Sequence, residues 1–204
     1  MGHSEKIRNH ELELLYQPVT IGNLALANRI VMAPMTRGFS PNGVPGKDVA
    51  GYYRRRAENE VGLIITEGTL INHPAAAEGL GRPNFHGEEA LRGWSHVVEA
   101  VHKAGGKIIP QLWHVGMARQ MDGDNPNPTA SPIGPSGIDV ATGKKVTEPM
   151  TSSEIDQIVK AFGQAASDAK SLGFDGLEIH GAHGYLIDQF FWGKTNQRQD
   201  EYGG

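Results

Sequence analysis

The chain has 204 residues, 38% of them hydrophobic, and a formal net charge of −4 at pH 7. This length suits one sizeable domain, so we expect residues 1–204 to fold as a single domain. The mild negative charge disfavours nucleic acid and anionic membranes as partners, because both attract basic surfaces. The absence of cysteine excludes disulfides and thiolate chemistry. The polar start and the lack of an apolar run of roughly 18 residues predict no signal peptide, no membrane span and a cytoplasmic protein.

Four short apolar runs are the first structural signal along the chain. They occupy residues 29–34, 63–68, 107–113 and 176–180. Nearly continuous hydrophobic runs are typical of parallel strands that are covered on both faces. Helical segments are expected between them, at residues 48–59, 88–104 and 151–172. This alternation of strands and helices predicts an α/β fold with a parallel sheet.

The segment at residues 151–172 carries the clearest helix signals. Thr151 and Glu154 form a capping-box pattern, in which each side chain bonds a free backbone amide at the helix start. One apolar face is predicted to contain Ile155, Ile158, Val159, Phe162, Ala166, Ala169 and Leu172. Gly105-Gly106 and Gly173 stand where the second and third helices should end.

Two segments lie outside the alternating pattern. Residues 12–27 are expected to form a hairpin ahead of the first strand. If the parallel sheet belongs to a barrel, that barrel would begin at residue 28 and the hairpin would lie against its floor. Residues 115–150 form a 36-residue connection with five prolines and five glycines. A βα loop usually has about 2–6 residues, and long loops of this kind are often functional. We therefore expect residues 115–150 to form a wall of the active site.

Polar and aromatic residues follow each predicted strand. Successive strand ends carry Met35-Thr36, Glu67-Gly68, Gln111 with Trp113, and His180 with His183 and Tyr185. The carboxyl ends of parallel strands meet at one edge, which is where α/β barrels hold their active sites. The chain has no Gly-x-Ser-x-Gly nucleophile elbow, no Gly-rich phosphate loop of a common type, and no carboxylate pair that indicates glycoside chemistry.

Three motifs in order resemble the signatures of the Old Yellow Enzyme family. They are Pro-Met-Thr-Arg at 34–37, Pro-Gln-Leu-Trp-His at 110–114, and His-Gly-Ala-His-Gly-Tyr-Leu-Ile-Asp-Gln-Phe at 180–190. Asn28-Arg29 and residues 198–204 also match the family. Its members are FMN-dependent NAD(P)H oxidoreductases on an eight-stranded TIM barrel. The resemblance implies that this chain covers about the first four βα units, and Thr36 places it in the branch with threonine rather than cysteine at that position.

The resemblance also implies roles for individual residues. FMN would be bound by Ala33, Pro34, Met35, Thr36, Gly68, Gln111 and His180, with the Thr36 hydroxyl on the flavin 4-carbonyl. NADH or NADPH would reduce the flavin. The reduced flavin would deliver hydride to the β-carbon of an α,β-unsaturated carbonyl or nitro compound. His180 and His183 would donate to the substrate oxygen, Tyr185 would supply the proton, and Trp113 would line the substrate pocket.

Other interpretations of the same residues stay open. His180 and His183 could bind a metal ion together with His114 or Glu178, as in a metal-dependent barrel hydrolase. Tyr185 could simply be a packed aromatic residue. His114 has no assigned role, and His96 and His102 are expected on a helix, either solvated or at the edge of the core.

The strand count leaves a further alternative. Four strands are half of a TIM barrel, and the resemblance places a flavin-binding arginine and the phosphate site in later strands. A non-catalytic half-barrel that pairs with its own copy, or with a separate carboxyl-terminal half, is therefore a third hypothesis.

Overall fold

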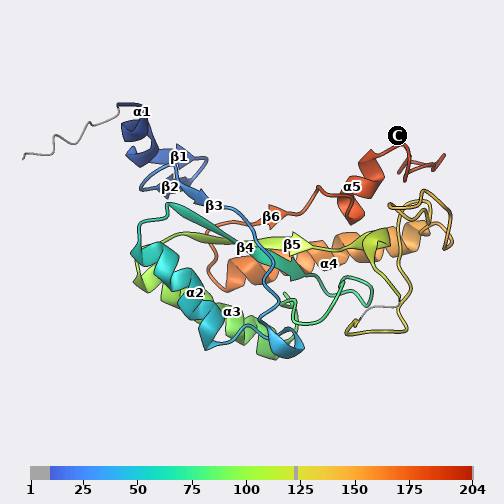
Figure 1. Cartoon of the computed structure of the whole chain (residues 1–204), viewed down its shortest axis with the longest axis horizontal. Helices are drawn as coiled ribbons and strands as arrows, with labels where there is room; N and C mark the ends of the chain where they lie inside the picture. The colour runs from blue at the N-terminus through green and yellow to red at the C-terminus, as the bar shows by residue number, and fades with distance from the viewer. Residues whose placement is uncertain (1–9, 122–123, 204) are drawn as a thin grey trace, which may run out of the picture.

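A four-stranded parallel sheet organises the molecule in the computed structural model, which describes residues 10–121 and 124–203. Its strands, in spatial order, are β3 (Val31–Met32), β4 (Leu63–Leu70), β5 (Ile108–Trp113) and β6 (Glu178–Ile179). The helices between them are α2 (Lys47–Glu58), α3 (Glu88–Lys103) and α4 (Ser152–Ser171). The predicted order of strands and helices is confirmed, and Figure 1 shows α2 and α3 side by side below the sheet.

The two edge strands are shorter and more exposed than their apolar runs suggested. β3 and β6 have two residues each, whereas β4 continues past the predicted end to Leu70. Val31 is 45% exposed and Ile179 is 51% exposed. The expectation that all four strands are covered on both faces is therefore wrong for the edge strands β3 and β6, because the described elements leave these side chains partly uncovered.

Helices α2 and α3 close the core against the sheet. Tyr53 of α2 and Trp94 of α3 are fully buried, and the Trp94 indole nitrogen donates to the carbonyl oxygen of Asn84 at 2.9 Å. Both helices contribute to one hydrophobic cluster with residues of β4 and β5. At about 25 cal/mol per Å² of buried apolar surface, such side chains supply the main drive for this packing.

Helix α4 begins with the predicted capping box. The Thr151 hydroxyl accepts from the Glu154 amide at 3.2 Å, and the Glu154 carboxylate accepts from the Thr151 amide at 2.7 Å. The predicted buried face is only partly correct, since Ile155 and Ile158 are buried whereas Val159 is 61% exposed. A helix that packs on one side of a sheet buries a narrow stripe, and Val159 falls beside that stripe.

The amino-terminal segment contains a hairpin that is shorter than residues 12–27. Strands β1 (Val19–Ile21) and β2 (Leu24–Leu26) pair antiparallel, and Gly22 takes the positive φ of +59° at the turn. Short helical turns, α1 (His10–Glu13) and η1 (Leu14–Tyr16), precede the hairpin, so the prediction was wrong over residues 12–16. Figure 1 places the hairpin beyond the amino-terminal end of the sheet.

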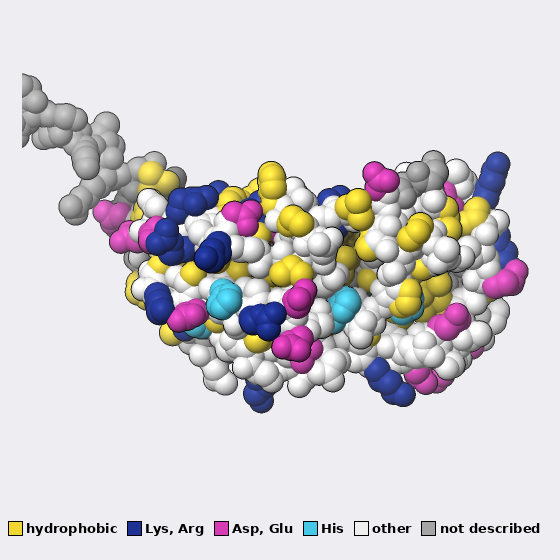
Figure 2. All heavy atoms as spheres, turned by 90° about the horizontal axis from the view of Figure 1, so that it is seen from below, with side chains coloured by type: hydrophobic (Ala, Val, Ile, Leu, Met, Phe, Trp, Pro, Cys, Tyr) yellow, Lys and Arg dark blue, Asp and Glu magenta, His cyan; other side chains and the backbone are white. Residues whose placement is uncertain are grey.

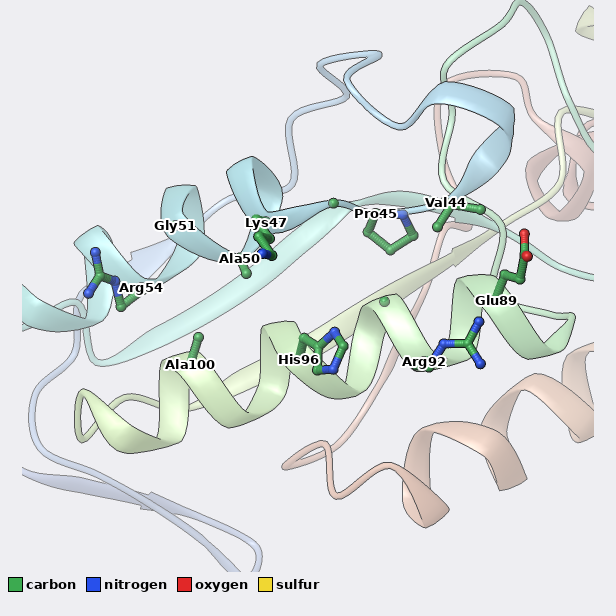
Figure 3. Close-up of a pocket in the computed structure, with 12 residues that line it drawn as sticks. Val44, Pro45, Lys47, Ala50, Gly51, Arg54, Glu89, Arg92, His96 and Ala100 are labelled. Carbon is green, nitrogen blue, oxygen red and sulfur yellow. The ribbon is translucent and has the colours of Figure 1, made fainter.

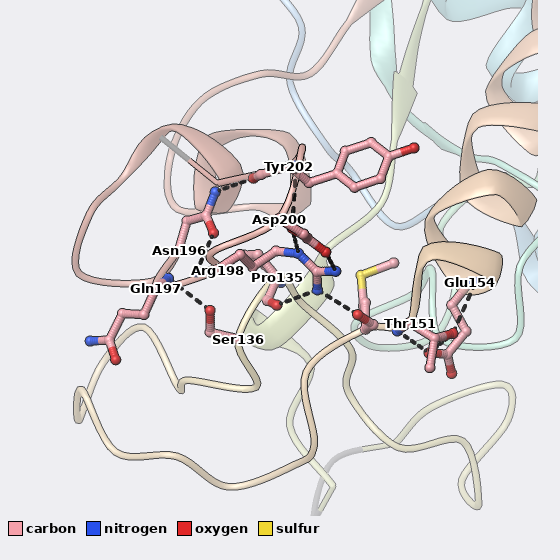
Figure 4. A network of polar contacts seen from close by, with 10 residues as sticks. Pro135, Ser136, Thr151, Glu154, Asn196, Gln197, Arg198, Asp200 and Tyr202 are labelled. Atoms are coloured by element: carbon pink, nitrogen blue, oxygen red, sulfur yellow. Dashed lines mark hydrogen bonds and ion pairs between the residues drawn. The ribbon is translucent and has the colours of Figure 1, made fainter.

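The long connection after β5 is held by specific contacts. It begins with η3 (Gly116–Ala118), and α5 (Leu186–Phe191), which was not predicted, packs beside η3. Arg198 donates to the carbonyl oxygen of Pro135 at 2.9 Å and to that of Met150, and it pairs with Asp200 (Figure 4). The connection lies with α5 at the carboxyl end of the sheet (Figure 1).

Charged side chains of both signs are mixed over the helical face of the molecule (Figure 2). Arg54 pairs with Glu58 at 3.5 Å, and Arg92 pairs with Glu88 at 3.3 Å. No described helix combines the length and apolar character that crossing a membrane requires.

Candidate functional site

The register of the parallel strands brings the predicted site residues to one edge of the sheet. Gly68 of β4 pairs with Gln111 of β5, which in turn pairs with Glu178 of β6. The backbone amide of His180 donates to the carbonyl oxygen of Leu112 at 2.9 Å, which continues this pairing to the end of β6. Gly68, Gln111 and His180 therefore lie on neighbouring strands near their carboxyl ends.

Four aromatic rings form a cluster at this edge, here called the aromatic cluster: Trp113, His180, His183 and Tyr185. The Trp113 and His180 rings are stacked, with centroids 5.9 Å apart and planes at 22°. Tyr185 meets both of these rings edge-on, at 4.9 Å in each case. His183 meets His180 at 5.3 Å. Two imidazoles, a phenol and an indole thus share one small region, as the motif spacing predicted.

The backbone at His183 is unusual. His183 has φ of +61°, and Gly184 follows with φ of +74°. A positive φ is uncommon for a residue other than glycine and is enriched where function constrains the chain. This sharp turn reverses the chain between the two histidines and Tyr185, and it supports a functional role for the His183 imidazole.

The protonation state of His180 follows from its surroundings. Burial lowers the pKa of His180, and the neighbouring His183 lowers it further. The Ala182 amide points at Nδ1 of His180 at 3.4 Å, which favours the neutral tautomer with its proton on Nε2. His180 is therefore a neutral hydrogen-bond donor near pH 7.

Tyr185 keeps its proton at the same pH. Burial raises the pKa of the Tyr185 phenol, the charge of Glu78 raises it further, and the charge of Arg82 lowers it. A phenol has an ordinary pKa near 10, so the raised value leaves the hydroxyl protonated near neutrality. Tyr185 can thus serve as a proton donor.

A buried ion pair holds the segment that carries Thr36. Glu67 is 1% exposed, and its carboxylate accepts from Arg37 at 2.6 Å through the guanidinium and at 3.1 Å through the backbone amide. The Arg37 guanidinium also lies 3.8 Å from the centre of the Tyr52 ring. Since Arg37 follows Thr36 directly, this pair fixes Thr36 at the rim, where the side chain is exposed.

Gly68 is required by close packing inside the site. A Cβ atom at Gly68 would lie 2.7 Å from Cε3 of Trp113. The glycine therefore makes room for the Trp113 indole, whose nitrogen is buried and has no hydrogen-bond partner among the described residues. The resemblance implied a close approach of flavin at Gly68, and the structure adds this second reason for glycine.

The residues considered as metal ligands are engaged elsewhere. Glu178 accepts from the side-chain amide of Gln111 at 2.7 Å. His114 is 1% exposed, and its Nε2 lies 2.9 Å from Nδ1 of His73. In the described part of the chain, no three His, Asp or Glu side chains are grouped to hold a metal ion. The hydrolase hypothesis therefore gains no third ligand from Glu178 or His114.

Gln189 is the main structural residue that the sequence did not reveal. It is 1% exposed, accepts from the Met117 amide at 3.1 Å, and donates to the carbonyl oxygens of Val115 at 3.3 Å and Gly184 at 2.6 Å. It thereby joins the long connection to the loop that bears His183. No spacing rule marks such a residue, because two of its partners, Val115 and Met117, are backbone groups more than 70 residues away in sequence.

A groove of about 710 Å³ lies elsewhere, between α2 and α3 (Figure 3). Its wall includes Pro45, Arg54, Arg92 and His96. A Cβ atom at Gly93 would lie 2.5 Å from the carbonyl oxygen of Pro45, so this glycine allows the chain before α2 to approach α3. The groove contains none of the residues predicted at the strand ends.

Comparison with known proteins supports the same family as the motifs. Residues 14–204 match the NADH:flavin oxidoreductase / NADH oxidase family. The chain is 40% identical over 202 residues to 12-oxophytodienoate reductase 7 of Oryza sativa subsp. japonica, covering 93% of this chain and 50% of that protein. It is 39% identical over 203 residues to flavin oxidoreductase hxnT of Emericella nidulans, covering 95% of this chain and 52% of that protein.

Solved structures agree in fold as well as in sequence. The structure of morphinone reductase in complex with tetrahydroNAD is 37% identical and matches with a TM-score of 0.84, over 93% of this chain and 55% of that one. The old yellow enzyme homologue from Zymomonas mobilis is 36% identical with a TM-score of 0.81, over 93% of this chain and 54% of that one. The chain spans about half the length of the relatives it matches, and its sheet corresponds to part of their TIM barrel. The chain belongs to the NADH:flavin oxidoreductase / NADH oxidase family, which includes the Old Yellow Enzyme homologues.

Proposed function

We propose that the protein containing this chain is an FMN-dependent NAD(P)H oxidoreductase that reduces electrophilic alkenes, namely α,β-unsaturated carbonyl or nitro compounds. The observation that carries the proposal is the aromatic cluster, in which His180 and Tyr185 pack on Trp113 and His183 meets His180. The names of the relatives, which include 12-oxophytodienoate reductase and morphinone reductase, support this class of substrate.

The residues at the rim fit FMN. The isoalloxazine ring has alternating donors and acceptors along one edge, and Gln111 offers an amide oxygen that has no hydrogen bond within the described residues. Thr36 offers an exposed hydroxyl on the neighbouring segment, and His180 a donor at Nε2. The exposed residues Ala33 and Met35 complete the set. When bound, FMN would accept hydride from NADH or NADPH and pass it to the substrate.

The contribution of the chain is to stabilise charge and to supply a proton. His180 and His183 would donate to the carbonyl or nitro oxygen, where negative charge develops. Removing one such donor typically lowers a rate about 10²–10³-fold. Tyr185 would deliver a proton to the α-carbon, a general-acid contribution of roughly 10²–10⁴-fold.

The variant Tyr185→Phe separates these two half-reactions. We expect flavin reduction by NAD(P)H to stay within about twofold of wild type and the reoxidation by an enone to slow by roughly 10²-fold or more, because only the second step needs the phenolic proton. Stopped-flow absorbance of the flavin measures both steps. Tyr16→Phe, at an exposed tyrosine in η1, is the matched control. Equal slowing of both half-reactions would contradict the role of Tyr185.

An absorbance spectrum of the purified protein tests the cofactor itself. Flavin bands in near-stoichiometric amount are expected. A colourless protein with bound zinc would refute the proposal and favour the hydrolase hypothesis.

We also propose that the open edges of the sheet bind further strands, from the remainder of a barrel or from a second copy of the chain. Exposed Val31 and Ile179 on the two edge strands support this, since unpaired strand edges favour pairing. Size-exclusion chromatography with light scattering measures the mass, and a monomer would exclude a second copy.

A further inference from the structure

Arg82, in the loop between β4 and α3, is enclosed by three glycines with left-handed backbone. Gly38, Gly79 and Gly81 have φ of +71°, +78° and +75°. A Cβ atom at Gly38 would lie 3.1 Å from Nη1 of Arg82, and one at Gly79 would lie 3.5 Å from Nη2. At Gly81 a Cβ atom would lie 2.4 Å from the carbonyl oxygen of Gly38. The backbone is thus folded closely around the guanidinium.

This guanidinium has no counter-ion among the residues that the structure describes. Its Nε is buried without a hydrogen-bond partner, and Nη1 has only a 3.4 Å contact with the carbonyl oxygen of Leu80. Other arginines that are partly buried have firm partners: Arg37 binds Glu67, Arg198 binds Asp200, and Arg119 donates to three carbonyl oxygens. The Arg82 guanidinium, in contrast, has only the long contact from Nη1 to Leu80 within the described residues, so its Nη groups remain available as charged donors.

Arg82 borders a cavity of about 530 Å³, here called the Arg82 cavity. Asn42 and Asn84 border the same cavity, as does Pro126 of the long connection. A guanidinium presents a planar set of N–H donors that matches a carboxylate or a phosphate, and amide groups can add further donors. The composition of the wall therefore favours an anionic ligand.

The same loop acts on the aromatic cluster. The charges of Glu78 and Arg82 shift the pKa of the Tyr185 phenol in opposite directions. The loop is also tied to the segment that carries Thr36, since the Ser40 amide donates to the carbonyl oxygen of Gly81 at 3.0 Å. An anion bound at Arg82 would therefore lie beside residues 38–40, which follow Thr36 along the chain.

We propose that the Arg82 cavity binds a carboxylate or phosphate group belonging to the alkene substrate or to the nicotinamide dinucleotide, and that Arg82 selects anionic ligands over uncharged ones. This inference rests on the proposed function, because it names a property of the ligands of that same site. Arg82 is a binding residue in this scheme and takes no part in hydride or proton transfer.

The test compares Arg82→Gln with Arg92→Gln, an exposed arginine on α3, in the flavin-loaded protein. The probes are cyclohexenone, a cyclohexenone carboxylic acid, NADH and NADPH. We expect R82Q to raise the KM of an anionic probe roughly 10–100-fold, the value of a charged hydrogen bond, and to leave that of cyclohexenone unchanged. A KM that rises only for the carboxylic acid assigns the cavity to the substrate. A KM that rises only for the dinucleotides assigns it to the reductant.

Calorimetric titration with inorganic phosphate supplies a readout that does not depend on turnover. Wild type and R92Q should bind phosphate, and R82Q should bind it at least tenfold more weakly. Equal binding by wild type and R82Q, or unchanged KM values for every anionic probe, would overturn the inference. A protein that binds no flavin would instead refute the proposed function, so the two failures are distinct.

Discussion

Because Gly68 has no side chain, the Trp113 indole can pack directly against the backbone of β4. The indole occupies the space that a Cβ atom at residue 68 would need, and the same indole stacks on His180 and meets Tyr185. The glycine is thus a packing requirement for the aromatic cluster. Gly68 therefore affects function indirectly, because it sets the position of the Trp113 indole in the aromatic cluster.

We predict that Gly68→Ala destabilises the fold by about 1–3 kcal/mol, because the added methyl group overpacks the site. Urea unfolding measures the loss, and near-ultraviolet circular dichroism follows the aromatic cluster. Gly163→Ala in α4 is the control: a Cβ atom there meets nothing within 4 Å, so a gain of about 0.5–1 kcal/mol is expected from helix propensity. Equal stability of the two variants would show that the Gly68 contact is unimportant.

The buried pair of Glu67 and Arg37 is a second interaction at this scale. Removing the carboxylate leaves a guanidinium, with 14% of its side chain exposed, without its partner. Breaking such a pair typically costs about 3–5 kcal/mol. We therefore expect Glu67→Leu to lower the urea midpoint strongly, and Glu58→Leu, at an exposed pair with Arg54, to change stability by less than about 1 kcal/mol. Similar losses in both variants would contradict this view of Glu67.

At the scale of elements, the site depends on contacts between the loop that bears His183 and the long connection at residues 115–150. Gln189 in α5 holds Met117 and Val115 from one segment and Gly184 from the other. Val140 of the connection also lies close to Gly184, 3.0 Å from where a Cβ atom would stand. The expectation that residues 115–150 form a wall of the active site remains a prediction, and these contacts support it.

The variant Gln189→Leu tests this connection. Each buried backbone group left unsatisfied costs roughly 1–3 kcal/mol, so we expect a total loss above about 2 kcal/mol. Hydrogen exchange should accelerate at the Met117 amide, which donates to Gln189. Gln164→Leu, at an exposed residue of α4 that bonds Asp168, should leave exchange at Met117 unchanged. Unchanged exchange at Met117 in Gln189→Leu would refute the link.

At the scale of the whole molecule, buried histidines couple stability to pH. Burial lowers the pKa of His73, His180 and, most strongly, His114, which the charge of His73 lowers further. The His114 Nδ1 accepts from the Gly116 amide at 2.9 Å, so the neutral form is built into the packing. The folded state therefore binds fewer protons than the unfolded state once the pH falls below about 6.5, the ordinary pKa of histidine.

The direction of the pH effect follows from these shifts. The contribution of these histidines to stability is fully present above about pH 6.5 and is lost as the pH falls below that value. Urea midpoints measured between pH 8 and pH 5 should decline over the acidic part of this range. His114→Gln should reduce the slope, whereas His96→Gln on the exposed face of α3 should not. An equal slope in wild type and His114→Gln would contradict the prediction.

Much of the architecture could be predicted because its signals are local. Apolar runs, the Thr151–Glu154 capping box and the glycines after the helices depend on neighbours a few residues apart. The motif spacing likewise predicted that Gln111 and His180 would lie at the same edge of the sheet, since parallel strands end at one edge. The exposure of Val31 and Ile179 could not be predicted, because it depends on which strands pair beyond each edge.

The sequence by itself determined the order of strands and helices, the family and the residue types at the site, because these follow from periodicity and from motifs within short segments. Only the tertiary structure decided that His114 meets His73, that Gln189 joins two loops, and that Arg82 borders a cavity without a counter-ion among the described residues. Those contacts join residues that are distant along the chain or enclosed by loops. Their energies depend on how deeply the groups are buried and on the distances between them, and folding sets both quantities.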